Sequence, residues 1–197
     1  SIENEFDELI SFRLIFNLFT QTPSITIEVP ATLPIESIDI DGTNGKIDIT
    51  DFDLETLSIE STNAEIRLND VHVIQAIDIE TTNGDIFINQ TSADMIDIET
   101  TNGLFNLNQV DARTYNLNTT NGIIRLESLN ETLKDGVSLN AITTNGRIEA
   151  YDVYVKNVEL RTTNGNIVYR NTDLTFILES FVHSNTNGSF EANVPVE

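Results

Sequence analysis

The sequence predicts an all-β protein, and within that class a β-solenoid of about eight rungs with a repeat of 19 to 20 residues. Two observations lead to this prediction. The tripeptide Thr-Asn-Gly returns along the chain at a nearly constant interval, and apolar residues alternate with polar ones on both sides of every copy. The composition agrees, because 39% of the 197 residues are hydrophobic and the chain has no Cys, so packing rather than disulfides must hold the fold.

The repeat is defined by its turn motif. The third residue of each copy is Gly45, Ala64, Gly84, Gly103, Gly122, Gly146, Gly165 and Gly188, which gives spacings of 19, 20, 19, 19, 24, 19 and 23 residues. A fixed period near 19 is typical of proteins that stack one structural unit many times.

Four apolar columns flank the motif. They lie two and four residues after the glycine position, and five and seven residues before it. Of these 32 positions 31 are apolar, whereas 39% of 32 would be about 12. Because alternate side chains of a strand point to opposite faces, each repeat is a strand, a bend and a second strand with one apolar side.

Such a unit cannot bury its apolar side alone, so we expect each strand to pair in parallel with its counterpart one rung away, at about 4.8 Å. Eight rungs then form a rod about 38 Å long, and parallel crossovers favour a right-handed coil, a parallel β-helix. The alternative is an immunoglobulin-like sandwich, whose strands do not repeat their own residues in register.

The Asn of the motif is expected to form a structural ladder. Asn and Gly tolerate a positive φ, which we expect the bend to need, and stacked Asn amides form hydrogen bonds from rung to rung. On this interpretation Ala64 is strained. A second interpretation is that the aligned Thr hydroxyls bind ice or a sugar. The predicted ladder consists of Asn44, Asn63, Asn83, Asn102, Asn121, Asn145, Asn164 and Asn187.

Two longer spacings predict insertions, at residues 127–136 and 170–180, which we expect to bulge from the rod as surface loops or contact sites. Residues 1–36 are expected to form N-terminal strands that cap the repeats of residues 37–197 within one domain. The cap is predicted as a strand after Ile10 and a second strand ending at Pro30. A short amphipathic helix with Phe6, Ile10, Leu14 and Leu18 on one face is the alternative.

At the other end of the coil, His183 and Asn185 take inward positions of the last rung. There we interpret their polarity as that of a terminal cap.

The net charge is −22 and it is concentrated in one half of the chain. Residues 1–100 contain 21 Asp and Glu against three Lys and Arg. This field repels the phosphates of nucleic acids and attracts cations, so we exclude nucleic acid as a partner. Two outward columns of carboxylates are predicted on the first strands of rungs one to four, formed by Asp39, Asp41, Glu60, Asp78, Glu80, Asp97 and Glu99.

This acidic face has two interpretations. It is either a solvated surface that opposes nonspecific association, or a binding face for Ca²⁺ or cationic peptides. Adjacent carboxylates about 5 Å apart repel by about 0.9 kcal/mol in water. The chain has no EF-hand loop, so any metal site here is expected to be weak, and we predict no cofactor.

Catalytic groups are few. The chain has no Cys, and its two histidines, His72 and His183, are about five rungs apart in the predicted coil, with His72 an ordinary corner residue. The alternative to a non-enzymatic protein is a carbohydrate-active β-helix, a polysaccharide hydrolase or lyase. It would use Asp and Glu near Arg125, Arg147 and Arg161.

A family resemblance rests on the segment "NLFTQTPSITIEVPATLPIESIDIDGTNGKIDI" and the recurring "IDIETTNGDI". Over residues 12 to 192 the chain resembles the bacterial adhesin-like domains of unknown function that are also called toastrack domains. The resemblance implies a stacked β-solenoid in envelope proteins of Gram-positive and other bacteria, with no catalytic residues to carry over.

Together these observations predict a non-enzymatic binding or scaffold module of the cell envelope, located at the cell surface or outside the cell. Its expected partner is a protein, a cationic peptide or an envelope component rather than a small molecule. No stretch approaches the roughly 20 apolar residues of a membrane-spanning helix.

Overall fold

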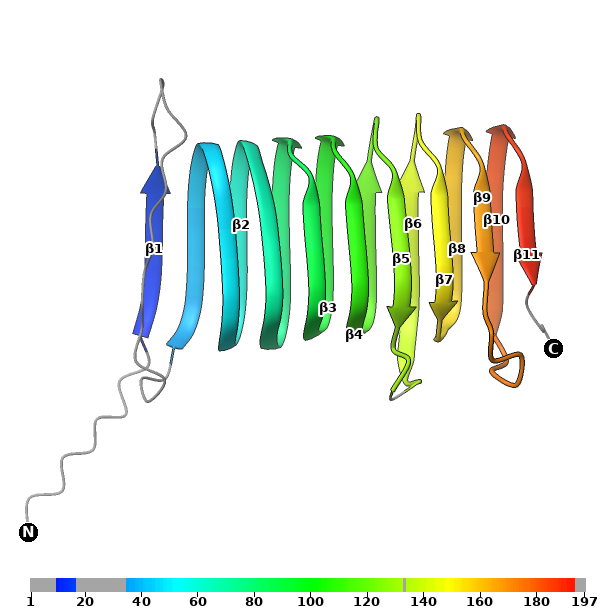
Figure 1. Cartoon of the computed structure of the whole chain (residues 1–197), viewed down its shortest axis with the longest axis horizontal. Helices are drawn as coiled ribbons and strands as arrows, with labels where there is room; N and C mark the ends of the chain where they lie inside the picture. Colours follow the sequence, from blue (N-terminus) through cyan, green and yellow to red (C-terminus); the bar gives the residue numbers. More distant parts are fainter. Residues whose placement is uncertain (1–9, 17–34, 133, 194–197) are drawn as a thin grey trace, which may run out of the picture.

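The computed structural model describes residues 10–16, 35–132 and 134–193, and it shows a β-solenoid (Figure 1). Every regular element in this part of the chain is a β-strand. The strands are β1 (Ile10–Phe16), β2 (Ile35–Asn83), β3 (Ile86–Asn102), β4 (Phe105–Thr119), β5 (Ile124–Leu129), β6 (Gly136–Thr143), β7 (Ile148–Val153), β8 (Val155–Asn164), β9 (Ile167–Arg170), β10 (Ser180–Asn187) and β11 (Phe190–Asn193).

All pairings are parallel and join each residue to its counterpart in the neighbouring repeat. Ile79 pairs with Ile98, Ile98 with Leu117, and Leu117 with Ala141. β2 is long because the strand assignment continues through the corners of the first rungs, so one strand makes more than one turn of the coil. The predicted fold is therefore confirmed, and its repeat unit is the predicted one.

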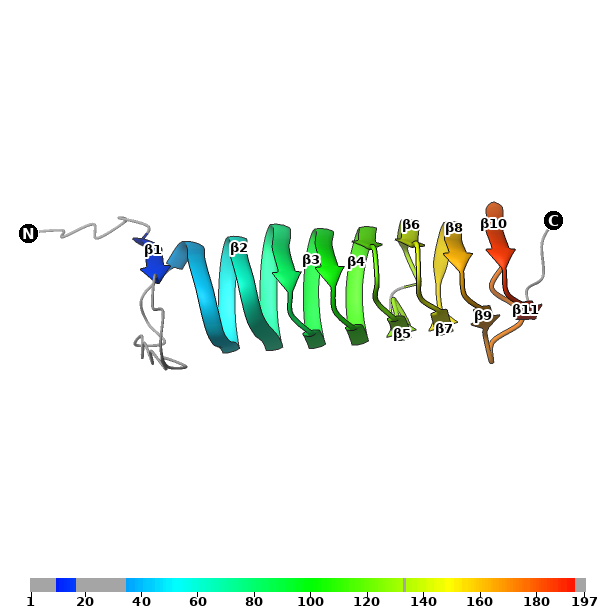
Figure 2. The ribbon, with the colours of Figure 1, turned by 90° about the horizontal axis from the view of Figure 1, so that it is seen from above.

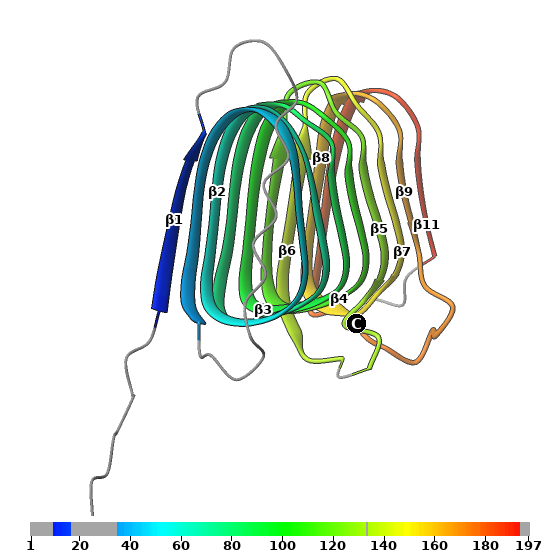
Figure 3. The ribbon, with the colours of Figure 1, turned by 60° about the vertical axis from the view of Figure 1, so that its left-hand side comes forward.

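The coil is flattened and right-handed. Two sheets face each other across a narrow interior (Figure 3). β5, β7 and β9 run down the near side in Figure 1, and β6 and β8 run up the far side while the chain advances toward its C-terminus (Figures 1 and 2). This is the hand that parallel crossover connections prefer.

The four predicted apolar columns fill the interior. Ile66, Ile86, Ile98 and Leu117 are 0 to 1% exposed, and Tyr115 is fully buried among them. Complete burial of an Ile or Leu side chain stabilises the fold by roughly 1.5–3 kcal/mol. The interior is thus continuous from rung to rung and requires each repeat to have a neighbour on both sides.

The Asn ladder exists as predicted. Each Asn Nδ2 donates to the Oδ1 of the Asn in the preceding rung, from Asn63 to Asn44 at 2.8 Å through to Asn187 to Asn164 at 2.8 Å. The five bonds between them measure 2.7 to 2.9 Å. All eight side chains therefore lie in one file along an edge of the rod, here called the Asn edge.

The predicted reason for glycine in the motif is wrong. Among the described residues, Gly45 is the one glycine with a positive φ, of 144°, and neither Ala64 nor any Asn of the ladder has one. The glycines are needed because successive rungs approach closely. A Cβ on Gly103 would lie 2.0 Å from the Gly84 carbonyl oxygen, and one on Gly146 would lie 1.7 Å from that of Gly122.

Ala64 is accordingly not strained in the way we expected. Its methyl group is buried, at 2% exposure, over the rung that contains Gly45. We attribute its accommodation to the different backbone of Gly45, which changes the direction of the peptide groups beneath it.

Left-handed residues occur at the opposite edge of the rod instead. They form a column six residues after the glycine position, with φ between 50° and 61°, and have polar side chains that tolerate or locally support this conformation. We call this edge the corner edge. Its left-handed column consists of Asp51, Asp70, Gln90, Gln109, Ser128 and Asp152.

At the N-terminal end, β1 pairs in parallel with the start of β2, with Phe12 opposite Ile38 and Leu14 opposite Ile40. A strand, not the alternative helix, therefore covers Ile10–Phe16. The second predicted strand, which ends at Pro30, lies outside the described residues, and the domain boundary at residue 36 stays a prediction.

At the C-terminal end, His183 stacks on the ring of Phe190, with ring centroids 3.5 Å apart, and both lie beside Phe181. His183 is exposed and Asn185 is half-buried. The column five residues before the glycine position, which is apolar in the other repeats, thus ends at His183. There the His183 ring stacks on the Phe190 ring at the open end of the coil.

Candidate functional surfaces

The acidic face lies on the sheet made by the first strands of the rungs. Asp78 and Asp97 are paired in register, as are Glu80 and Glu99, so the carboxylates of adjacent rungs are direct neighbours. The seven predicted residues are all exposed or half-buried. The structure therefore brings the predicted acidic residues onto one surface.

Few cations compensate this surface. Arg13 lies 3.5 Å from Asp39 at the N-terminal end. In the described part of the chain, Glu60, Asp78, Glu80, Asp97 and Glu99 take part in no ion pair, and Asp97 accepts one long hydrogen bond from Asn116 Nδ2, at 3.4 Å.

Partial burial, and then the charge of Asp97, raise the pKa of Asp78. Asp78 and Asp97, which are neighbours in one column on adjacent rungs, therefore repel each other in the folded state.

The face ends where the repeat changes composition. Asp97 is followed in register by Asn116 and then Asn140, and Glu99 is followed by Asn118 and then Ile142. The acidic surface is thus confined to the N-terminal half, as the charge asymmetry of the sequence indicates.

The three arginines of the enzyme alternative do not form one site. Arg125 and Arg147 both pair with Glu149, at 3.0 and 3.1 Å, on the sheet of the second strands. Arg161 pairs with Glu159 on the sheet of the first strands. Glu149 therefore lies between these two cations.

Metal ligands are not gathered in the described residues, where no three Asp, Glu or His side chains lie close enough together to hold an ion. His72 is exposed at the corner edge and contacts Ser92 Oγ at 3.0 Å and Asp70 at 3.6 Å. These contacts agree with its interpretation as a corner residue.

Threonines line the Asn edge in two columns that differ in exposure. The motif Thr residues from Thr62 onward are exposed along the file, as a hydroxyl array requires. A second column, three residues before the glycine position, is buried, and its members Thr143 and Thr162 donate to the carbonyl oxygens of Gly122 and Gly146 at 3.1 and 2.8 Å. Sequence reasoning missed this inner column, although its regular spacing was visible.

Every departure from the 19-residue repeat lies at the corner edge. The 20-residue spacing comes from a register shift between His72 and Ala76, where Ile74 is pushed outward and is 71% exposed. The two predicted insertions also leave the rod at this edge, which is the lower one in Figure 1. We call their described parts the first loop, residues 130–132 and 134–135, and the second loop, residues 172–178.

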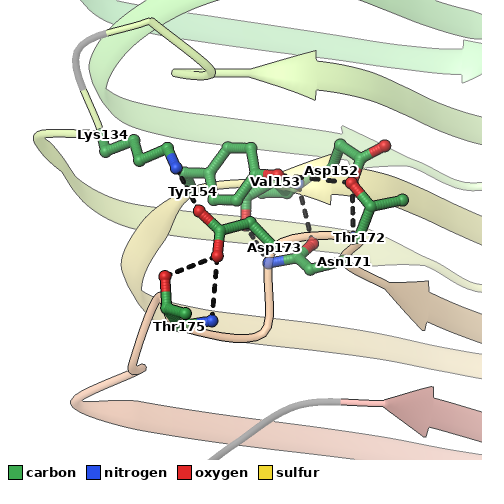
Figure 4. Close-up of polar contacts among 8 residues, drawn as sticks. All are labelled: Lys134, Asp152, Val153, Tyr154, Asn171, Thr172, Asp173 and Thr175. Carbon is green, nitrogen blue, oxygen red and sulfur yellow. Dashed lines mark hydrogen bonds and ion pairs between the residues drawn. The ribbon is translucent and has the colours of Figure 1, made fainter.

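The two loops are tied to each other (Figure 4). Lys134 of the first loop pairs with Asp173 of the second, and the Lys134 Nζ atom lies 4.7 Å from the centroid of the Tyr154 ring. Asp173 also accepts hydrogen bonds from the amide of Thr175, at 2.9 Å, and from its hydroxyl. The hydrogen bonds from Lys134 and Thr175 lower the pKa of Asp173.

A buried asparagine fixes the base of each loop. Asn130 accepts from the amide of Ala112 at 2.9 Å and donates to its carbonyl at 2.8 Å. Asn171 likewise accepts from the amide of Val153 and donates to its carbonyl, at 2.9 Å for both bonds. Sequence reasoning missed both residues, because the two Asn stand at different offsets from the repeat.

The comparisons agree with this architecture. The family model described as Toastrack DUF4097 matches residues 4–141. Neither a search of curated proteins nor a search of solved structures returned a match.

Proposed function

Because the chain belongs to the Toastrack family of domains of unknown function, we propose that it is a non-enzymatic binding or scaffold module of the bacterial cell envelope, and that its acidic face binds cationic segments of a partner. The β-solenoid and the family are consistent with a scaffold or binding module. A rod whose rungs are locked in register presents a rigid, repetitive surface, and such surfaces suit extended partners.

One observation carries the proposal for the acidic face: its adjacent carboxylates are in register and have almost no basic neighbours. A lysine or arginine placed between two rungs would relieve the repulsion that the fold maintains there. The carboxylates follow the rod rather than converge on a point, which favours a polycation over a single metal ion.

Isothermal titration calorimetry with a ten-residue lysine peptide and, separately, with CaCl₂ tests this proposal. The face variant carries Asp78→Asn, Glu80→Gln, Asp97→Asn and Glu99→Gln. We expect it to bind the peptide at least about tenfold more weakly than the parent, and we expect the peptide heat to fall steeply as salt is added.

The matched control removes four charges from the same half of the chain but outside the face, with Asp51→Asn, Asp53→Asn, Glu55→Gln and Glu65→Gln. We expect this change in net charge alone to weaken the binding of the lysine peptide by less than about threefold. Equal losses of peptide affinity in the face variant and the control variant, or no heat of peptide binding with the parent, would reject the acidic face as a specific binding surface. A heat with CaCl₂ that the face variant loses would instead identify a metal site.

The envelope location and the lack of enzymatic activity are part of the same proposal. None of the described residues belongs to a helix that is long and apolar enough to cross a bilayer. Labelling of intact producing cells with a membrane-impermeant reagent tests exposure at the surface. Incubation with a panel of envelope polysaccharides tests turnover, and release of reducing ends would favour the hydrolase alternative.

A further inference from the structure

A shallow cleft of about 270 Å³ lies at the corner edge, on the side opposite the Asn ladder. It exists because adjacent corners differ in length. The corners that contain Ala93 and Ala112 belong to 19-residue repeats and are short, whereas the corners on either side are extended by Ile74 and by the first loop. The two short corners form the floor, and the two long ones form the walls.

The floor and one wall are apolar. Val73 and Ala112 are each 4% exposed, and Ala93 packs against the core between them. Ile74 stands at the rim with 71% of its surface exposed, the highest value among the large exposed hydrophobic residues of the described chain. Together with the floor, Ile74 gives the cleft a continuous apolar side.

The opposite wall is hydrogen-bonded to the floor. Asn130 is 1% exposed, and its two hydrogen bonds to the backbone of Ala112 hold the start of the first loop against the floor. Ala112 is held from below as well, because its amide also donates to Tyr115 Oη at 2.8 Å. A partner would therefore meet a cleft whose shape exists before binding, which lowers the entropic cost of association.

The charge of the cleft is negative and is only partly compensated. Asp94, Asp111 and Asp135 line it, and Arg113 is the one basic residue among its lining residues, placed 3.8 Å from Asp94. Among the described residues, neither Asp111 nor Asp135 takes part in an ion pair. Burial, and then the charges of Asp135 and Glu131, raise the pKa of Asp111.

We propose that this cleft binds a lysine or arginine side chain of a partner protein, flanked in the partner's sequence by apolar residues. The ammonium or guanidinium group would lie between Asp111 and Asp135, and an apolar neighbour would pack on Ile74 and Val73. Charge complementarity selects a cation, and the apolar floor selects its flanking residues. The cleft is separate from the acidic face, so this site does not depend on the function proposed above.

Nuclear magnetic resonance titration with short peptides tests the site. The probe is acetyl-Gly-Leu-Lys-Leu-Gly-amide, and two matched peptides replace Lys by Glu or both Leu by Ala. We expect the Lys peptide to shift the backbone amide signals of Ser92, Ala93 and Ala112. We expect the Glu peptide to shift none of them and the Ala-flanked peptide to bind about fivefold more weakly.

Two variants locate the binding. Asp111→Asn with Asp135→Asn should raise the dissociation constant of the Lys peptide about tenfold. Ile74→Ser should remove the preference for Leu over Ala, and because Ile74 is exposed this variant remains folded. Glu80→Gln with Glu99→Gln removes two charges from the acidic face and should change the constant less than about twofold.

Three results would overturn the proposal: no shifts at Ser92, Ala93 and Ala112, unchanged affinity in the double Asp variant, or no effect of Ile74→Ser on the Leu preference. Loss of binding in the Glu80 and Glu99 variant would also reject the cleft, and it would place the cation on the acidic face instead. The variants that test the cleft therefore differ from the variants that test the acidic face, so each proposal can be rejected separately.

Discussion

The two edges of the rod solve the same problem, reversing a strand once per repeat, in different ways. At the Asn edge every rung but the one with Ala64 uses the same three residues, and successive backbones approach so closely that a Cβ on Gly103 would lie 2.0 Å from the Gly84 carbonyl oxygen of the preceding rung. At the corner edge the chain turns through left-handed residues such as Gln109, and its length varies from rung to rung. Uniform contacts between rungs leave no room for insertions, whereas corners of unequal length accept them.

The comparison also shows which edge contains the features that could differ in function. The exposed Ile74, both loops and the cleft all belong to the corner edge. The Asn edge keeps the rungs in register, whereas the corner edge contains the segments that differ in length and sequence from one rung to the next. The predictions below test this division of roles, beginning with the largest expected effect.

The first prediction concerns insertion at the two edges. Gly-Ser-Gly placed between Asn102 and Gly103 should destabilise the protein by about 5 kcal/mol, because it breaks the ladder and separates backbones that are in contact. The same tripeptide between Arg113 and Thr114 should cost about 1 kcal/mol, mainly the entropy of a longer loop. Urea unfolding measures both, and similar losses would show that the edges do not differ.

The second prediction concerns the close approach of the rungs. Gly103→Ala should lower the free energy of unfolding by about 3 kcal/mol, because the new methyl group meets the Gly84 carbonyl and forces the rungs apart. The control is the reverse change in the copy that already has alanine, Ala64→Gly, which should cost about 1 kcal/mol through the lost methyl group and added chain entropy. A mild effect of Gly103→Ala would contradict our explanation for glycine in the motif.

The third prediction concerns the hydrogen bonds of the ladder. Asn102→Ala removes two side-chain bonds, one to Asn83 and one from Asn121, and should cost about 1.5 kcal/mol. Asn187 makes one ladder bond at the end of the file, so Asn187→Ala should cost about half as much. If thermal unfolding gave equal losses for the two positions, the ladder would be only a by-product of the coil.

The fourth prediction concerns the left-handed corner residues. Gln109→Gly should stabilise the protein by about 0.5 kcal/mol, because glycine removes the steric cost of a φ of 54° but adds entropy to the unfolded chain. Asn106→Gly, in a regular strand nearby, should instead destabilise it. Loss of stability in Gln109→Gly, measured by urea unfolding, would indicate that the glutamine side chain has a role of its own.

The fifth prediction is the smallest and concerns the tie between the loops. The lowered pKa of Asp173 means that its ionised form is favoured by folding, so its contribution is complete above the ordinary pKa of 3.8 and is lost as the pH falls through the lower folded value. Asp173→Asn should therefore lower the melting temperature slightly at pH 6. The difference from the parent should shrink as the pH is lowered below about 4, and a difference independent of pH would exclude this cause.

The regular part of the molecule could be predicted from the sequence because its signal is repeated eight times. The buried columns around Ile98 and the Asn ladder follow directly from residues that recur at fixed offsets. A second ladder, in which Asn108 donates to Asn89 and Asn89 to Asn69, was missed. Its signal is weaker, because Asn stands at this offset in only three consecutive repeats.

The reason for the glycines could not be predicted, because a positive φ and a close approach of two backbones both select glycine. The sequence did contain a signal for the true location of the left-handed residues. The position six residues after the glycine is Asp, Gln or Ser in the first six repeats, and Asp in particular tolerates the left-handed region. For the cleft the sequence supplies only the unequal spacings of 20, 19, 19 and 24 residues, and the path of the first loop, on which the cleft also depends, does not follow from the repeat.

The most direct test of the coil is a pair of engineered disulfides at the Asn edge, in a chain that has no cysteine of its own. Thr82 and Thr101 lie on adjacent rungs, between the register pairs Thr81–Thr100 and Asn83–Asn102. The variant Thr82→Cys with Thr101→Cys should cross-link on oxidation, because neighbouring strands are about 4.8 Å apart. Thr82→Cys with Thr120→Cys spans two rungs and should stay reduced, whereas cross-linking of the distant pair with none in the adjacent pair would contradict the stacked coil.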